Sequence, residues 1–146
     1  MANNIIIGLG GTGGKIIRSL RKMTHQMHRG EIPDRPRVRF LYVDSNDEFM
    51  RQDDASWKVI GGESVQLGQG ETLKIHGTNL AKTLDEVVAF PGIKPWIGNR
   101  ESWKTILASQ DGAQLFAAQK RRLGRFLFAT NVDKYLDKLT GIVSEI

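Results

Sequence analysis

A cluster of glycines near the start of the chain has the spacing of an anion-binding turn. The segment from Asn4 to Lys15 reads NIIIGLGGTGGK, and Gly8, Gly10 and Gly13 in it fit the pattern G-x-G-x-x-G. Backbone N–H groups can approach a phosphate closely in such a turn, because no Cβ atoms stand in the way. A helix that begins here adds the partial positive charge of its N-terminus. The chemistry expected of this segment is therefore the binding of phosphate groups by the main chain.

The same glycines could belong to a Walker A loop or to a turn that only packs a helix against a sheet. A Walker A loop requires a glycine where Leu9 stands and a Ser or Thr where Ile16 stands, so that pattern fails at two positions. A packing turn is the simpler alternative. It needs one or two glycines, and the additional Gly11 and Gly14 therefore favour a nucleotide.

The elements around the turn predict an α/β fold. The apolar run 5–7 has the pattern of a short buried strand, the apolar spacing over 11–27 is helical, and 38–43 predicts a second strand that ends at Asp44. This order indicates a Rossmann-like, mostly parallel sheet flanked by helices. In a doubly wound sheet, polar residues at the tip of the second strand lie beside the nucleotide. The residues expected there are Asp44, Ser45 and Asn46. The alternative for Asp44 and Asn46 is that they only cap a short helix through Met50.

The middle of the chain has weaker patterns. Alternating apolar residues predict short strands at 57–60 and 64–67, and helical spacing predicts a helix at 80–88. Prolines and glycines make 91–98 a turn-rich interruption. We expect Trp96 and other aromatic residues of this region to be packing residues.

The C-terminal part is predicted to be helical again from 112 onward, with a break near Asn131 and Asp133, which are good capping residues. A βα fold should return to its sheet after a helix, and the sequence ends without a further strand. We therefore expect a single domain over 1–146 that is the truncated front part of a longer protein, with an inserted lobe at about 57–110.

Composition limits the function classes. The chain has 146 residues, a net charge of +5 and no cysteine, which excludes disulfides and thiolate metal sites. No apolar run predicts a membrane span, and a cytoplasmic location is expected. Residues 120–125 form a basic run, which either binds phosphate or a partner or is a solvated face of a helix. Binding of nucleic acid is not expected.

Catalytic and metal-ligating residues are not apparent. The three histidines, His25, His28 and His76, have no recognisable triad partners. His25 and His28 are three residues apart, a spacing that could serve a metal, but no nearby acidic partner is expected, and they are better explained as cations near a helix C-terminus. We therefore predict no catalytic residue and no metal site.

The sequence resembles the tubulin/FtsZ superfamily, in particular the bacterial tubulin-like proteins. The motifs are IIIGLGGTGGK, FLYVDSND after the second strand, and more loosely DGAQLFAAQKRRLGR. The resemblance implies GTP or GDP, with or without Mg²⁺, held by three loops. Their residues would be Gly8, Gly10, Gly11, Thr12, Gly13, Gly14 and Lys15 in the first, Asp44, Ser45 and Asn46 in the second, and Gly112, Ala113 and Gln114 in the third.

The sequence departs from that family in ways that affect activity. Lys15 replaces the asparagine of the bacterial division proteins, and neither a second glycine-rich loop of the type GGGTGSG nor the synergy loop that delivers a catalytic acid is present. The resemblance implies self-association of a full-length cytoskeletal protein, with filament formation as one form of it. GTP hydrolysis is then expected only from a longer, assembled protein, and not from this chain alone.

Functions of three other kinds are compatible with the same residues. The chain could be the NAD-binding domain of an oxidoreductase, with Asp44 on the adenosine ribose. It could be a ThiF-like module that binds ATP through a similar turn, or a non-catalytic interaction domain. Comparison of GTP, NAD and ATP binding separates these alternatives.

Overall fold

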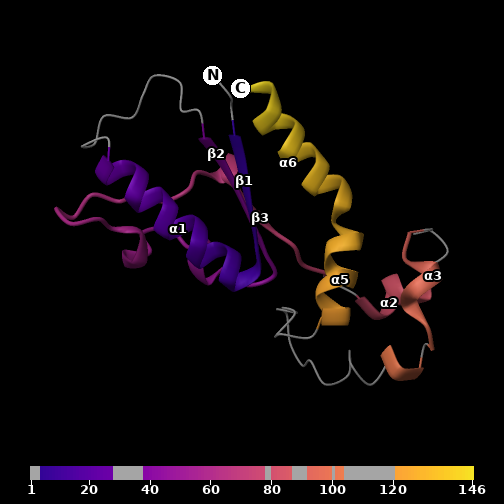
Figure 1. The fold of residues 1–146 in the computed structure, drawn as a ribbon. Coiled ribbons are helices and arrows are strands. Elements are labelled where there is room, and N and C mark those ends of the chain that lie inside the picture. The colour runs from indigo at the N-terminus through magenta and orange to yellow at the C-terminus, as the bar shows by residue number, and fades with distance from the viewer. Residues whose placement is uncertain (1–3, 28–37, 78–79, 87–91, 100, 104–120) are drawn as a thin grey trace. The chain divides into compact units, whose positions relative to one another are not determined.

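The computed structural model describes residues 4–27, 38–77, 80–86, 92–99, 101–103 and 121–146 (Figure 1). The strands are β1 (Asn4–Leu9), β2 (Val38–Asp44) and β3 (Thr72–Lys74). The helices are α1 (Gly10–Met27), α2 (Leu80–Asp85), α3 (Lys94–Ile97), α5 (Arg121–Thr130) and α6 (Val132–Ser144). Short 3₁₀ helices lie at Glu48–Met50, Ala55–Trp57 and Gln69–Glu71.

The strands form one parallel sheet with β2 in the middle. β1 pairs with β2 from Asn4 opposite Val38 to Leu9 opposite Val43. β3 pairs with the other edge of β2, with Thr72 opposite Tyr42. A parallel sheet connected through a helix is the arrangement that the strand and helix patterns predicted. The α/β, Rossmann-like class is confirmed.

One face of β2 packs against α1. Successive side chains of a strand point to opposite faces, so Phe40 and Tyr42 lie on the same side. Both are buried in one apolar cluster with Ile17 of α1 and with Trp57. Full burial of one such side chain stabilises the fold by about 1.5–3 kcal/mol. This cluster fixes α1, and with it the glycine turn, on the sheet.

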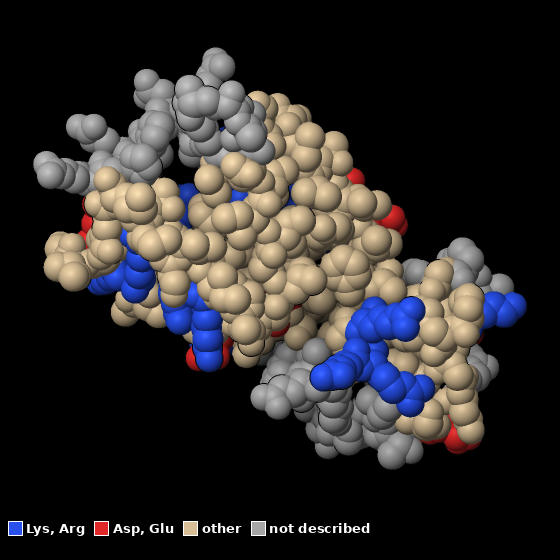
Figure 2. All heavy atoms as spheres, in the orientation of Figure 1, with Lys and Arg blue, Asp and Glu red and all other residues tan. Residues whose placement is uncertain are grey.

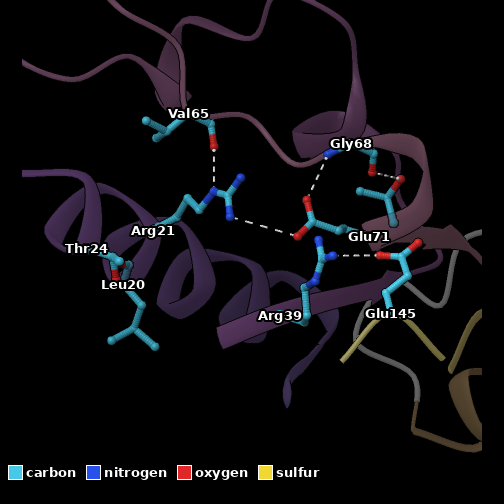
Figure 3. Close-up of polar contacts among 9 residues, drawn as sticks. Leu20, Arg21, Thr24, Arg39, Val65, Gly68, Glu71 and Glu145 are labelled. Atoms are coloured by element: carbon cyan, nitrogen blue, oxygen red, sulfur yellow. Dashed lines mark hydrogen bonds and ion pairs between the residues drawn. The ribbon is translucent and has the colours of Figure 1, made fainter. Parts of the chain in front are cut away.

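α6 lies on the other side of the sheet from α1 (Figure 1). Leu41 and Val43 point to that side and are almost completely buried. Arg39 lies on the same face, and its guanidinium contacts the carboxylate of Glu145 at 2.9 Å (Figure 3). In Figure 1 the sheet accordingly lies between α1 and α6.

Polar contacts connect α1 to the segment between β2 and β3. Nε of Arg21 donates to the carbonyl of Val65 at 3.4 Å, and the same guanidinium lies 3.9 Å from Glu71 (Figure 3). Glu71 in turn accepts a hydrogen bond from the backbone N–H of Gly68. The long connection that precedes β3 is thereby tied to the helix.

His25 has an acidic neighbour that its sequence position did not reveal. Its Nε2 lies 3.1 Å from a carboxylate oxygen of Glu63, which is 38 residues further along the chain. The expectation of a histidine without an acidic partner was therefore wrong for His25. His28 lies outside the described residues.

The chain divides into two compact units. The first comprises 1–74 and 134–146, and the second comprises 75–133. The second unit has its own buried apolar residues, among them Trp103 and Phe126, whose ring centroids are 5.3 Å apart. Asn131, between α5 and α6, is buried and donates to the carbonyls of Leu127 and His76. The helix break expected at Asn131 is confirmed.

Arginines of α5 lie on the surface of the second unit. Arg121, Arg122 and Arg125 are exposed, and Figure 2 shows Lys and Arg side chains gathered on this unit. The guanidinium of Arg125 lies 4.1 Å from the ring centre of Trp96, and that of Arg122 lies 5.0 Å from the ring centre of Trp103. Two arginines of the basic run therefore pack on aromatic rings of their own unit, where cation–π attraction holds them.

Two strands expected from alternation are not strands. Side chains at 57–60 and 64–67 do alternate between buried and exposed, but the two segments pair only through one antiparallel bridge, Lys58 to Ser64. The alternation comes from an extended loop that packs on the core. Conversely, β3 was not expected, because a strand as short as Thr72–Lys74 has almost no local pattern of its own.

The turn-rich interruption at 91–98 contains a helix. α3 begins at Lys94, and Pro95 lies in its first turn, where the missing N–H of proline leaves no helical hydrogen bond unmade. Gly98 ends it with a φ of 72°. In the part of the chain that is described, no helix has both the length and the apolarity to cross a membrane.

Candidate functional site

The predicted glycine turn (residues 8–14) has no segment of its own in the structure, because β1 ends at Leu9 and α1 begins at Gly10. Some of its glycines are required for packing. A Cβ atom on Gly13 would lie 2.7 Å from the carbonyl carbon of Gly8, which is closer than two such atoms can approach. A Cβ atom on Gly14 would lie 2.6 Å from the ring of Tyr42. Strand and helix therefore touch backbone to backbone at Gly8 and Gly13. This is the close approach that the last glycine of a G-x-G-x-x-G turn permits.

The other glycines of the turn face open space. Apart from the adjacent residues and the backbone of α1 itself, no heavy atom of the described residues lies within 4 Å of the place where a Cβ atom would stand on Gly10 or Gly11. Gly10 also has a φ of 67°, a conformation that side chains disfavour. Packing explains Gly8, Gly13 and Gly14 but gives no reason for a glycine at position 11.

The start of α1 has the electrostatics of an anion site. The first N–H groups of a helix lack partners inside the helix, and the helix dipole places positive charge there. The first turn of α1 contains no acidic residue that would neutralise this charge. Thr12 and Lys15 are exposed beside these N–H groups. Open space, N–H donors and positive potential together suit a phosphate group.

The tip of β2 lies next to this turn. Leu9 is opposite Val43, so Gly10 and Asp44 follow at the same end of the sheet. One oxygen of Asp44 accepts from the hydroxyl of Tyr42 at 2.6 Å, and the other accepts from the backbone N–H of Asn46 at 3.2 Å. The structure therefore brings the first two predicted loops to the same sheet edge.

The rest of the tip is also held by side chains. Asn46 accepts from the N–H of Glu48 at 3.0 Å, and Ser45 is buried. Asn46 thus supports the start of the short helix Glu48–Met50. The capping residue Asp47 itself makes no side-chain capping hydrogen bond.

Tyr42 remains protonated at any physiological pH. Burial raises the pKa of its hydroxyl far above the ordinary value, and the hydrogen bond to the Asp44 carboxylate raises it further. A protonated hydroxyl donates, so the contact with Asp44 is a charge-assisted hydrogen bond.

Asp47 connects the tip of β2 to β3. Its carboxylate accepts a hydrogen bond from Nζ of Lys74 at 2.8 Å, and this contact lowers the pKa of Asp47. Because folding lowers this pKa, the pair stabilises the fold above the ordinary carboxyl pKa of about 4. The stabilisation is lost as the pH falls through the lowered pKa.

We expect Asp47→Asn to lower the free energy of unfolding by about 0.5 kcal/mol at neutral pH, as is typical of a partly exposed ion pair. The difference from the unsubstituted chain should shrink as the pH falls through the lowered pKa of Asp47, because the carboxylate is then protonated. Urea unfolding at neutral pH and at a series of acidic pH values measures this. Asp53→Asn, at an exposed residue with a φ of 61° that asparagine tolerates, is the control and should change little. A difference that persists unchanged in acid would contradict the assignment.

The remaining predicted site residues are not placed. Gly112, Ala113 and Gln114 lie outside the described residues. In the described stretches no group of His, Cys, Asp and Glu side chains is suited to hold a metal ion.

A hollow of about 450 Å³ lies in the same unit but away from the glycine turn. Its walls come from α6 and from residues near β3, among them Arg39, Glu71 and Leu73. Figure 3 shows Arg39 paired with Glu145 there. The lining includes cations, carboxylates and apolar residues, and none of the predicted site residues is among them.

Sequence reasoning missed the part that Tyr42 plays. Tyr42 lies in the segment 38–43 that was predicted as a strand, but its contacts with Gly14 and Asp44 depend on how α1 lies on the sheet. A tyrosine two residues before a strand-ending aspartate is the only signal in the sequence, since residues i and i+2 share a face.

The chain was compared with curated proteins, with solved structures and with models of protein families, and only the family models gave a match. The model of a family described as tubulin like matches residues 5–146, which include β1, the glycine turn and β2. With almost its whole length matched, the chain belongs to the tubulin-like family.

Proposed function

We propose that the chain binds the phosphates of a guanine nucleotide at the glycine turn, as part of a tubulin-like GTP-binding protein. The observation that carries the proposal is the open space at Gly10 and Gly11 at the start of α1. Packing does not require a glycine at position 11, whereas a phosphate that is bound by backbone N–H groups does. Membership of the tubulin-like family supports guanine as the base.

The elements of the site have separate tasks in this proposal. The backbone at Gly10 and Gly11, with the side chains of Thr12 and Lys15, surrounds the phosphates. Asp44 supplies a carboxylate beside them. Hydrolysis and self-association, as the family suggests, belong to the assembled protein, and we assign no catalytic residue to this chain.

The decisive variant is Gly11→Ala. A methyl group at this position meets no atom of the protein, so the free energy of unfolding should stay within about 0.5 kcal/mol of the original. The same methyl group would occupy the space through which a phosphate reaches the backbone. We expect GTP affinity to fall by about tenfold or more, which corresponds to about 1.4 kcal/mol. Isothermal titration calorimetry with GTP measures the affinity.

Gly70→Ala is the matched control, because Gly70 also faces open space but lies in the helix Gln69–Glu71, away from the turn. It should bind GTP like the original chain. Equal GTP affinity of Gly11→Ala and Gly70→Ala would contradict the phosphate site. Titration with NAD and ATP separates the alternatives: a preference for NAD would indicate a dinucleotide-binding domain, a preference for ATP an adenylating module, and no binding an interaction domain.

A further inference from the structure

Tyr42 touches two parts of the proposed site at once. Its side chain is completely buried, and the end of its ring lies 2.6 Å from the place where a Cβ atom of residue 14 would stand. Its hydroxyl donates to Asp44 at 2.6 Å. The same residue therefore contacts the first turn of α1 and fixes the carboxylate at the tip of β2.

The carboxylate of Asp44 is held but retains acceptor capacity. Each of its oxygens accepts one hydrogen bond, from Tyr42 or from the N–H of Asn46, and a carboxylate oxygen can accept two. Asp44 is only half-buried, so the remaining lone pairs are accessible. An ionised carboxylate offers acceptors only. Its remaining partners must be a hydroxyl or N–H donor or a cation.

Arg18 of α1 is occupied elsewhere. It lies one turn beyond Gly14, and its positive charge acts to lower the pKa of Tyr42 against the larger effect of burial. However, its guanidinium donates to Ser56 at 2.8 Å and lies 4.6 Å from the ring centre of Phe49. It is therefore held against another part of the fold.

We propose that Tyr42 is a positioning residue that fixes the Asp44 carboxylate beside the glycine turn, where it accepts an electropositive group of the bound nucleotide. This inference rests on the proposed function. The group is either a ribose hydroxyl or a divalent cation carried by the phosphates. Tyr42 restricts Asp44 to one orientation, and a ligand that meets a fixed acceptor loses less freedom on binding.

The test is a double-mutant cycle on nucleotide affinity. Tyr42→Phe removes only the hydroxyl and should weaken GTP binding by about fivefold, in the range of the net contribution of one ordinary hydrogen bond. In an Asp44→Ala background the same change should have less than about a twofold effect, because the group it positions is gone. A merely structural tyrosine would weaken binding equally in both backgrounds, and that result would overturn the proposal.

Two further titrations identify the group that Asp44 accepts. If it is a ribose hydroxyl, the effect of Tyr42→Phe disappears with 2′,3′-dideoxy-GTP. If it is a cation, the effect disappears when Mg²⁺ is removed with EDTA. An effect that persists in both would show that Asp44 meets neither group, against the proposal.

The outcomes also separate this inference from the proposed function. If the original chain binds no nucleotide, both fail together. If the original chain and Tyr42→Phe bind GTP equally, only the role of Tyr42 is refuted. Should Tyr42→Phe fail to fold, Asp44→Asn takes its place, with the same loss of binding and the same dependence on ribose or Mg²⁺ expected.

Discussion

Replacing Gly13 by alanine is expected to lower the free energy of unfolding by about 3 kcal/mol, as for other substitutions that overfill a tightly packed position. The new Cβ atom would lie 2.7 Å from the carbonyl carbon of Gly8 and 2.9 Å from its Cα atom. Both are backbone atoms of β1, which is held in register by β2, so no flexible side chain can move aside. The helix has to separate from the strand.

Urea unfolding followed by circular dichroism measures this effect. Gly141→Ala is the matched control, since Gly141 lies inside α6 and faces open space. Alanine is the better helix former, so this control should gain up to about 1 kcal/mol. A Gly13→Ala variant as stable as the original would show that β1 and α1 do not touch at these glycines.

Replacing Trp57 by alanine is expected to cost about 3–5 kcal/mol, the usual range for removal of a large buried aromatic side chain. Trp57 is completely buried in the cluster with Ile17, Phe40 and Tyr42. Its indole Nε1 also donates to the carbonyl of Phe49 at 3.0 Å, and the variant leaves that carbonyl without this donor. The cavity and the lost hydrogen bond both lower the free energy of unfolding.

Ile60→Ala provides the comparison, because Ile60 is an apolar residue of the same loop that is 95% exposed. Its removal should change the stability by less than about 0.5 kcal/mol. Thermal and urea unfolding of both variants give the two values. If Trp57→Ala and Ile60→Ala were equally stable, the loop that contains Trp57 would not be part of the core.

The fold could be predicted from the sequence wherever the signal was local. The isoleucines of β1, the glycines after them and the apolar spacing up to Met27 specify a strand, a turn and a helix without reference to the rest of the chain. β2 was predicted for the same reason, and its bounds agree. β3 was not, because its residues form a strand only through pairing with Tyr42 to Asp44, about thirty positions earlier.

The sequence predicted which residues belong to the candidate site, but not which of them pack against the fold and which face open space. The pattern G-x-G-x-x-G identified the turn, and the end of the second strand identified Asp44. The pattern assigns the packing role to its last glycine, Gly13, but no local pattern separates Gly11, which faces open space, from Gly14, which packs against Tyr42. That distinction depends on the position of the helix on the sheet. The roles assigned to these residues toward a nucleotide stay predictions.

Side chains of the loop after β2 hold the loop itself in place. Asp44 and Asn46 each accept a hydrogen bond from a backbone N–H two residues further on, and Asp47 is anchored to Lys74. These contacts set the path of the loop through its own side chains, with no other molecule needed. A small molecule that binds at this edge of the sheet would therefore contact a loop that is already ordered. Little of its binding free energy would be lost in ordering that loop.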